Sequence, residues 1–312
     1  METFITKNIW LVAISTSMAI GYAVGFTSIY FFEEYGWTVF VLVPFILGFV
    51  PTLFYGYTEE ITPKDAFKIG FTTLFLFCLT TLLFAVEGVI CIVMASPIIS
   101  LATLLGALSG YAIVQSDYFK SKRLYSLIVL PAIVLIVDTQ IDSTAYLEVK
   151  TTIEIEAPIE KVWNNVISFG QIDEPDEWFF KTGISYPTHA NIAGEGVGAV
   201  RYCNFTTGSF VEPITFWQAP TLLQFDVQDQ PTPMREMNPF WDVHPPHLDG
   251  YFQSKKGEFQ LSERTNGQTF VQGTTWYNIH IHPVGYWDFW SKYILHKIHY
   301  RVLEHIKKES EK

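Results

Sequence analysis

The sequence predicts a two-part fold: an α-helical membrane bundle over residues 1–140, followed by an α+β domain over residues 146–312. Five long apolar stretches precede residue 138, and charged residues fall in the gaps between them. All eight histidines and seven of the nine tryptophans follow that point. Polar and apolar residues then alternate from residue 146, as in a half-exposed strand. We therefore expect a membrane bundle that tethers a water-exposed domain, with the function in that domain.

The apolar stretches predict about five membrane-spanning helices. A hydrocarbon core of about 30 Å needs about 20 helical residues, and the first four stretches reach that length. The fifth would give about 21 Å of helix and has Pro131 at its centre. It is expected as a short span, with a re-entrant or interfacial segment as the alternative. The stretches are 8–32, 37–57, 66–86, 88–114 and 124–137.

Basic residues predict the orientation of the bundle. Cytoplasmic loops carry an excess of lysine and arginine, and here the basic residues of the gaps fall on one side only. We expect the amino terminus in the cytoplasm and the second domain outside it, in a bacterial inner membrane. The first span is too long for a cleavable signal peptide. The basic residues on that side are Lys7, Lys64, Lys68, Lys120, Lys122 and Arg123.

Charge also narrows the function classes. Transporters usually place ionisable groups near the middle of the bilayer, whereas the acidic residues of the first part, such as Glu33, Glu60 and Glu87, lie in gaps. The bundle is therefore interpreted as an anchor rather than a conduction path. A net charge of -11 and the lack of a basic stripe argue against nucleic acid as a partner. The oligomeric state is left open.

The second part has an α+β order of elements. A strand over about 146–156 precedes a helix that Pro158 opens. Strand patterns recur at 198–205, 210–217, 222–228, 252–261 and 269–282, with Thr207-Gly208 and Asn266-Gly267 as hairpin turns. A long amphipathic helix over about 286–308 should cover one face of the sheet. Its expected sheet-facing line is Trp290, Ile294, Ile298 and Val302.

Several motifs resemble a known superfamily. The segment Ala157-Pro-Ile-Glu-Lys-Val-Trp163 resembles the opening signature of the START-like proteins, the SRPBCC or polyketide cyclase/dehydrase and lipid-transport superfamily. The resemblance implies a helix-grip fold with a hydrophobic cavity between a curved antiparallel sheet and the C-terminal helix. Members bind lipids, sterols, hormones or polyketides, and some catalyse reactions, so the fold does not determine the function. Further segments similar to a bacterial membrane-anchored branch are 196–203, 207–214, 247–251, 273–277 and 298–306.

The candidate ligand-binding residues lie in these segments. With a turn at Thr207-Gly208, Cys203 pairs with Glu212, and Arg201 lies diagonally across from Glu212 on a mostly apolar face. This group is either a polar floor that orients a ligand head group or a structural ion pair. His247 and His299 match positions in the similar segments. The full set is Arg201, Cys203, Glu212, His247, Trp276, Ile298 and His299.

Other chemistry has little support in the sequence. Although His244 and His247 are close in sequence, no framework of zinc ligands accompanies them, so no metal is expected. There is no nucleophile elbow and no phosphate loop that opens a helix, so no cofactor is expected. The proline-rich segment 230–250 could be a lid, a bilayer contact through Phe240-Trp241, or a loop packed on the sheet.

Two functions follow as hypotheses. The first is a membrane-anchored domain that holds a lipid or another hydrophobic small molecule between sheet and helix. The second is a cyclase, dehydratase or hydrolase that acts on a hydrophobic substrate in the same cavity, with Arg201, Glu212, His247 or His299 transferring protons. An enzyme would require several of these groups to converge on one point, which distinguishes the two hypotheses.

Overall fold

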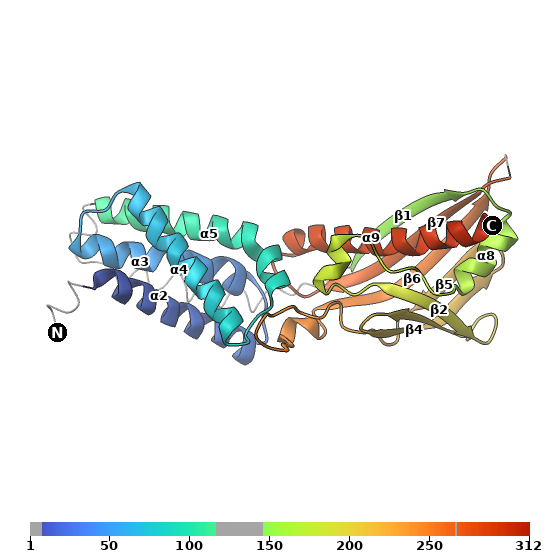
Figure 1. Cartoon of the computed structure of the whole chain (residues 1–312), viewed down its shortest axis with the longest axis horizontal. Helices are drawn as coiled ribbons and strands as arrows, with labels where there is room; N and C mark the ends of the chain where they lie inside the picture. Colours follow the sequence, from blue (N-terminus) through green and yellow to red (C-terminus); the bar gives the residue numbers. More distant parts are fainter. Residues whose placement is uncertain (1–7, 117–145, 266) are drawn as a thin grey trace. The chain divides into compact units, whose positions relative to one another are not determined.

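The computed structural model describes residues 8–116, 146–265 and 267–312, and these divide into two compact units (Figure 1). The helical unit contains the described residues up to 116 together with Glu236–Pro246 and Ile281–Pro283. The sheet unit contains the rest of the second part of the chain. Two short segments from the second part therefore belong to the helical unit. The expected domain boundary, over residues 141–145, lies outside the described residues.

The helical unit contains four helical segments long and apolar enough to cross a bilayer, as expected for the first four apolar stretches. The fifth stretch, 124–137, lies outside the described residues. The four spans are Ile9–Phe31 (α2, Ile9–Phe26, with the π-helical turn η1, Thr27–Phe31), Thr38–Thr58 (η2, Thr38–Leu42, and α3, Val43–Thr58), Pro63–Leu83 (α4) and Val89–Gln115 (α5).

Local sequence accounts for the beginnings and the packing of these helices. Thr62 and Asp65 form a capping box at the start of α4, with Pro63 at the first helical position. Gly48 of α3 and Gly106 of α5 let the two backbones approach, since a Cβ on either would lie 2.1 Å from a carbonyl oxygen of the other helix. Small residues at such contacts are typical of helix packing in membranes.

The sheet unit is a seven-stranded antiparallel sheet with the order β1-β7-β6-β5-β4-β3-β2. Helix α9 contacts both edge strands, β1 and β2, so the curved sheet closes around this helix (Figure 1). The expected helix-grip fold is therefore confirmed. The strands are Tyr146–Ile155 (β1), Pro187–Ala193 (β2), Val200–Phe205 (β3), Gly208–Gln218 (β4), Leu222–Asp226 (β5), Phe252–Glu263 (β6) and Thr269–Ile279 (β7), and the helical segments are Ile159–Ile167 (α8), Trp178–Thr182 (η3), Pro246–Leu248 (η4) and Val284–Ser310 (α9).

The main core of the sheet unit lies where α8 and the C-terminal half of α9 cover the sheet. Trp163 of α8 packs edge-on against Trp217 of β4, with ring centroids 5.6 Å apart. Val302, Leu303 and Ile306 contribute the α9 side of this core. Asn165 of α8 donates a hydrogen bond to Ser310 near the end of α9. The two helices are therefore held together at this end of the domain.

The sequence placed the β3–β4 turn one residue too late. Phe205 pairs with Gly208, so Thr206 and Thr207 form the two-residue connection and Arg201 stands directly opposite Glu212. The expected register and the observed register differ by two residues along β4. Because side chains alternate between the two faces of a sheet, Arg201 and Glu212 lie on the same face in both registers.

The expected sheet-facing line of α9 is also only partly right. Val302 is buried, but Trp290, Ile294 and Ile298 are only half-buried. A line at constant spacing four drifts by about 40° per step around a helix, so it cannot stay on one face over three steps. The aliphatic positions that are buried follow spacings of seven, one and three residues, which keep them on one face of the helix: Leu295, Val302, Leu303 and Ile306.

Candidate functional site

An ion pair lies on the inner face of the sheet at the β3–β4 ladder. Arg201 and Glu212 stand opposite each other, and Nη1 of Arg201 donates a hydrogen bond to Oε2 of Glu212. Arg201 is 2% exposed and Glu212 is 6% exposed. A pair this deeply buried loses the hydration of both charges, so its geometry must compensate for that loss.

Aromatic rings and one carbonyl complete the surroundings of the arginine. The guanidinium carbon lies 5.7, 5.5 and 5.6 Å from the ring centroids of Phe169, Phe225 and Phe259, within the range of cation–π attraction. Its Nε donates to the carbonyl oxygen of Ile167, the last residue of α8. We call Arg201, Glu212 and the three phenylalanines the arginine cage.

A glycine positions one ring of the arginine cage. Gly257 on β6 pairs with Phe225 on β5, and a Cβ at Gly257 would lie 2.3 Å from the Phe225 ring. The ring therefore occupies the space above the glycine backbone. Any larger residue at 257 would displace the ring from the guanidinium.

The arginine cage uses only part of the hydrogen-bonding capacity of its guanidinium. An arginine carries five N–H donors, and within the described residues the Arg201 guanidinium hydrogen-bonds Ile167, Glu212 and Cys203.

Burial and charge shift the titrations of this site. Burial lowers the pKa of Arg201, but the charges and hydrogen bonds of Glu212 and Cys203 together outweigh it and raise the pKa, so the arginine stays protonated. Burial raises the pKa of Glu212, and Arg201 opposes that rise without cancelling it. Cys203 lies two residues from Arg201 on the same strand face, and burial followed by the charge of Glu212 raises its pKa to about 12. A thiol in this state is not a ready nucleophile.

A second polar cluster joins α9 to β1 and β7. The hydroxyl of Thr151 lies 2.8 Å from Nδ1 of His296 and 3.0 Å from Nδ1 of His299. Nε2 of His299 lies 2.8 Å from the hydroxyl of Thr275. Both ring nitrogens of His299 are thus hydrogen-bonded by threonines. We call Thr151, Thr275, His296 and His299 the histidine clamp.

The histidine clamp favours uncharged imidazole. Burial, reinforced by the neighbouring His296, lowers the pKa of His299 to about 4. One hydroxyl that accepts and one that donates satisfy a neutral ring. This arrangement fixes the position of α9 on the sheet rather than leaving His299 poised to exchange protons near neutral pH.

The structure separates the other expected site residues from the arginine cage. Trp276 follows Thr275 on β7, and neighbouring strand residues point to opposite faces of the sheet. Thr275 contacts α9, so Trp276 lies on the face away from α9, where the Lys256 ammonium is 5.3 Å from the centroid of its ring. His247 lies in η4, a short helical turn between β5 and β6. His299 lies against β1 and β7, which β6 and β5 separate from β4 in the sheet order. Arg201, Cys203 and Glu212 alone of the expected residues are brought together.

A shallow polar pocket of ≈ 350 Å³ lies in the same unit, away from the arginine cage. The side-chain amide of Gln230 makes two hydrogen bonds at this pocket: Nε2 donates to the carbonyl oxygen of Phe252, and Oε1 accepts from the backbone N–H of Ser254. The pocket is lined by 227–232, 248–250 and 253–255. The sequence did not indicate this pocket, nor the three rings of the arginine cage, which come from three elements far apart in the chain.

Comparisons with known proteins inform the fold only. No protein-family model matches the sequence, and no curated protein matches it. The sheet unit is similar to solved structures of the START-like type. Norcoclaurine synthase from Thalictrum flavum is 11% identical over 54% of this chain and 95% of its own, with a TM-score of 0.34. XoxI from Bacillus cereus is 14% identical over 52% and 94%, with a TM-score of 0.34.

A third similar structure is the Aha1 dimer from Colwellia psychrerythraea, 19% identical over 53% of this chain and 96% of its own, with a TM-score of 0.32. Identities and TM-scores this low carry no inference about ligand or activity. The START-like fold expected from the sequence motifs is confirmed by the curved antiparallel sheet and the long C-terminal helix of this chain itself.

Proposed function

We propose that this chain is an integral membrane protein whose sheet unit binds a lipid or another hydrophobic small molecule, with the polar end of the ligand at Arg201. The observation that carries this proposal is the arginine cage. A buried guanidinium with five donors has Ile167, Glu212 and Cys203 as hydrogen-bond partners within the described residues and is surrounded by three phenylalanine rings. Ligand sites typically combine apolar walls with a few placed polar groups.

The charge of the arginine cage selects the head group. Arg201 and Glu212 together are neutral. An anionic head group would leave one net negative charge in a poorly hydrated site, which is costly. A neutral oxygen acceptor, such as a hydroxyl, ketone or ester, would use the free donors of Arg201 without that cost. We therefore propose an uncharged polar head on an apolar body.

Proton-transfer catalysis is the weaker alternative. Within the described residues no hydrogen bond connects His299 to Arg201 or Glu212, and the high pKa of Cys203 keeps its thiol protonated. Catalysis would require several titratable groups to converge on one reacting atom, and this arrangement does not meet that requirement. Binding requires only the arginine cage and its apolar surroundings.

The membrane topology is part of the proposal. The basic residues Lys64 and Lys68 lie in the first two turns of α4, and on the positive-inside rule they place that end in the cytoplasm. The amino terminus would then be cytoplasmic and the sheet unit outside, in a bacterial inner membrane. Reporter fusions after Lys150 and within 58–65 should report opposite sides. Two cytoplasmic reports would contradict this topology.

The ligand proposal can be tested on the full chain purified from membranes. Extracted molecules would be identified by mass spectrometry and compared with those from the double variant Arg201→Met/Glu212→Leu, which replaces the ion pair by apolar groups of similar size. We expect a neutral lipid-like molecule enriched in the native protein and lost from the double variant. Trp276→Ala, on the outer face, is the matched control and should retain it. An identical extract from all three proteins would contradict the proposal.

A further inference from the structure

The segment 236–246 comes from the second part of the sequence but belongs to the helical unit. It lies where α4 ends and α5 begins. The amide nitrogen of Asn238 donates to the carbonyl oxygens of Leu82 and Glu87, at 2.9 and 3.1 Å. The indole N–H of Trp241 donates to the carbonyl oxygen of Leu83, at 2.8 Å. Leu82 and Leu83 are the last two residues of α4.

These contacts complete the ends of two helices. The last four carbonyls and the first four N–H groups of a helix have no partner within it. Asn238 and Trp241 supply donors to the end of α4, and the carbonyl of Met237 accepts from the N–H of Val89, the first residue of α5, at 2.7 Å. One short segment therefore caps both ends of the α4–α5 connection.

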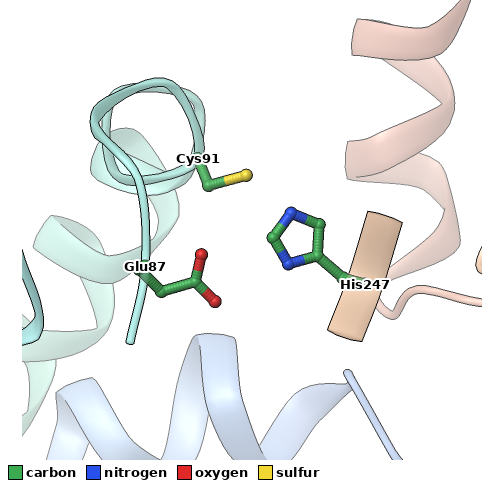
Figure 2. Close-up of side chains that lie close together, drawn as sticks. All are labelled: Glu87, Cys91 and His247. Carbon is green, nitrogen blue, oxygen red and sulfur yellow. The ribbon is translucent and has the colours of Figure 1, made fainter. Parts of the chain in front are cut away.

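The start of α5 is shaped to receive this segment. A Cβ on Gly88 would lie 1.9 Å from a carboxylate oxygen of Glu236, so a glycine is required there. The thiol of Cys91, in the first turn of α5, donates to Glu236. Figure 2 shows Cys91 and Glu87 projecting from this end of α5; His247, labelled in the same view, belongs to the sheet unit.

Asn238 also organises the segment itself. Its side-chain oxygen accepts from the backbone N–H groups of Phe240 and Trp241, at 2.9 and 3.2 Å. With its two donated bonds, this side chain uses its amide as both donor and acceptor. The two aromatic residues are thereby held beside the helix ends, yet Phe240 is 54% exposed and Trp241 55% exposed.

We infer that segment 236–246 is an interfacial membrane anchor, with Phe240 and Trp241 in the head-group region of a lipid bilayer. Leu83 and Val89 are the ends of two segments that are long and apolar enough to span a bilayer, so groups that cap them lie at the bilayer surface. Tryptophan is enriched at that depth because its ring is apolar and its N–H polar. The exposed apolar surface continues onto Phe84, 72% exposed at the end of α4.

The neighbouring gap adds aromatic residues at the same end. Tyr35, between η1 and η2, donates a hydrogen bond to Glu87, which joins the two gaps. Phe31, the last residue of η1, is exposed. A lipid surface, rather than a protein partner, is the occupant that is continuous with the apolar spans. This inference does not depend on ligand binding at the arginine cage.

Site-specific photocrosslinking of the full chain tests the inference. The photoreactive p-benzoylphenylalanine would replace Phe240 or Trp241 in turn, in nanodiscs of phosphatidylethanolamine and phosphatidylglycerol, and adducts would be identified by mass spectrometry. Phe75, exposed on α4, is the positive control, and Val197, exposed in the sheet unit between β2 and β3, is the negative control. We expect lipid adducts at 75, 240 and 241 and none at 197.

Two outcomes would overturn the inference: lipid adducts at 240 and 241 no more abundant than at 197, or crosslinks there to another protein in native membranes. A second pair of variants examines the docking of the segment. Asn238→Asp places a carboxylate against the Leu82 and Glu87 carbonyls, whereas Asn238→Gln retains the amide. We expect the aspartate variant to lose the lipid adduct at 240 and the glutamine variant to retain part of it; equal adduct yields would contradict the anchoring role of Asn238.

Discussion

The arginine cage and the histidine clamp use buried polar groups in opposite ways. The cage holds two opposite charges and engages only part of the donor capacity of Arg201 within the described residues, whereas the clamp holds a neutral His299 whose two ring nitrogens both hydrogen-bond to threonines. Burial acts on both, but the cage retains its charges because each has a counterion. In the clamp, burial favours the uncharged form of His299. This difference is why we propose the cage, and not the clamp, as the ligand site.

The largest expected effect is the loss of stability when one charge of the cage is removed and the other remains. Arg201→Met leaves the Glu212 carboxyl buried without its partner, and breaking a buried pair typically costs about 3–5 kcal/mol of stability. The double variant Arg201→Met/Glu212→Leu should recover most of that loss. Thermal unfolding of the detergent-solubilised full chain measures both. If the single and double variants unfold at the same temperature, the pair is not coupled as described.

The histidine clamp should make stability depend on pH. The folded pKa of His299, about 4, lies below its unfolded value of 6.5, so the unfolded chain binds the extra proton between these values. Its contribution is complete above pH 6.5 and is lost as the pH falls towards 4.

The size of this effect is at most about 3 kcal/mol, from about 1.4 kcal/mol per unit of pKa shift, and smaller because the ring is partly exposed. His299→Asn should remove this component while the carboxylates continue to titrate. Unfolding temperatures of both proteins across this range measure it. Identical pH profiles would contradict the assignment of a neutral buried His299.

Side chains on the two faces of the domain should differ in their effect on binding. Ile298→Ala removes a half-buried side chain of α9. It should lower the free energy of unfolding by about 2 kcal/mol, at the low end for core truncations, and should weaken uptake of an apolar fluorescent probe.

Trp276→Ala loses the contact with Lys256, worth about 0.5–1 kcal/mol at an exposed site, and should leave uptake unchanged. Lys292→Ala loses an exposed ion pair with Asp288 and should change neither measurably. Equal loss of uptake in Ile298→Ala and Trp276→Ala would contradict the assignment of faces.

The smallest expected effect concerns Cys203. Its buried thiol, with a pKa of about 12, should resist maleimide near neutral pH in the folded chain and react after denaturation. Peptide mapping by mass spectrometry distinguishes it from Cys78 and Cys91. Rapid labelling of Cys203 in the folded protein would show that the interior beside the arginine cage is open to water.

Periodicity and length were sufficient to predict the four apolar helical segments of the described residues and the α+β order of the second part, whereas the helix-grip fold was implied by the motif resemblance. The four spans are long apolar runs, and the strands alternate as a one-sided sheet requires. The face shared by Arg201 and Glu212 was also predictable, because a register error of two preserves the face. The turn position was not, since Thr206-Thr207 lacks the glycine that the sequence rules favour and Gly208 instead begins β4 with a φ of +147°.

Contacts between residues far apart in the sequence could not be predicted from local patterns. The rings of the arginine cage come from the loop after α8, from β5 and from β6, and no local spacing relates them. Strand β2 was missed because its residues do not alternate in burial with a clear period. The docking of 236–246 on the helical unit depends on helix-end carbonyls, which sequence patterns do not reveal. The aromatic character of Phe240 and Trp241 nevertheless indicated a bilayer contact as one alternative.

The preference between two matched probes tests the central claim most directly. A long-chain alcohol and the fatty acid of the same length would be titrated into the full chain and into Glu212→Gln, which keeps the shape of the site but leaves Arg201 with an uncompensated charge. We predict that the native protein binds the alcohol about tenfold or more tightly than the acid, a difference of about 1.4 kcal/mol, and that Glu212→Gln reverses the preference. An unchanged preference in the variant, or no binding of either probe to the native protein, would contradict a head-group site at Arg201 and Glu212.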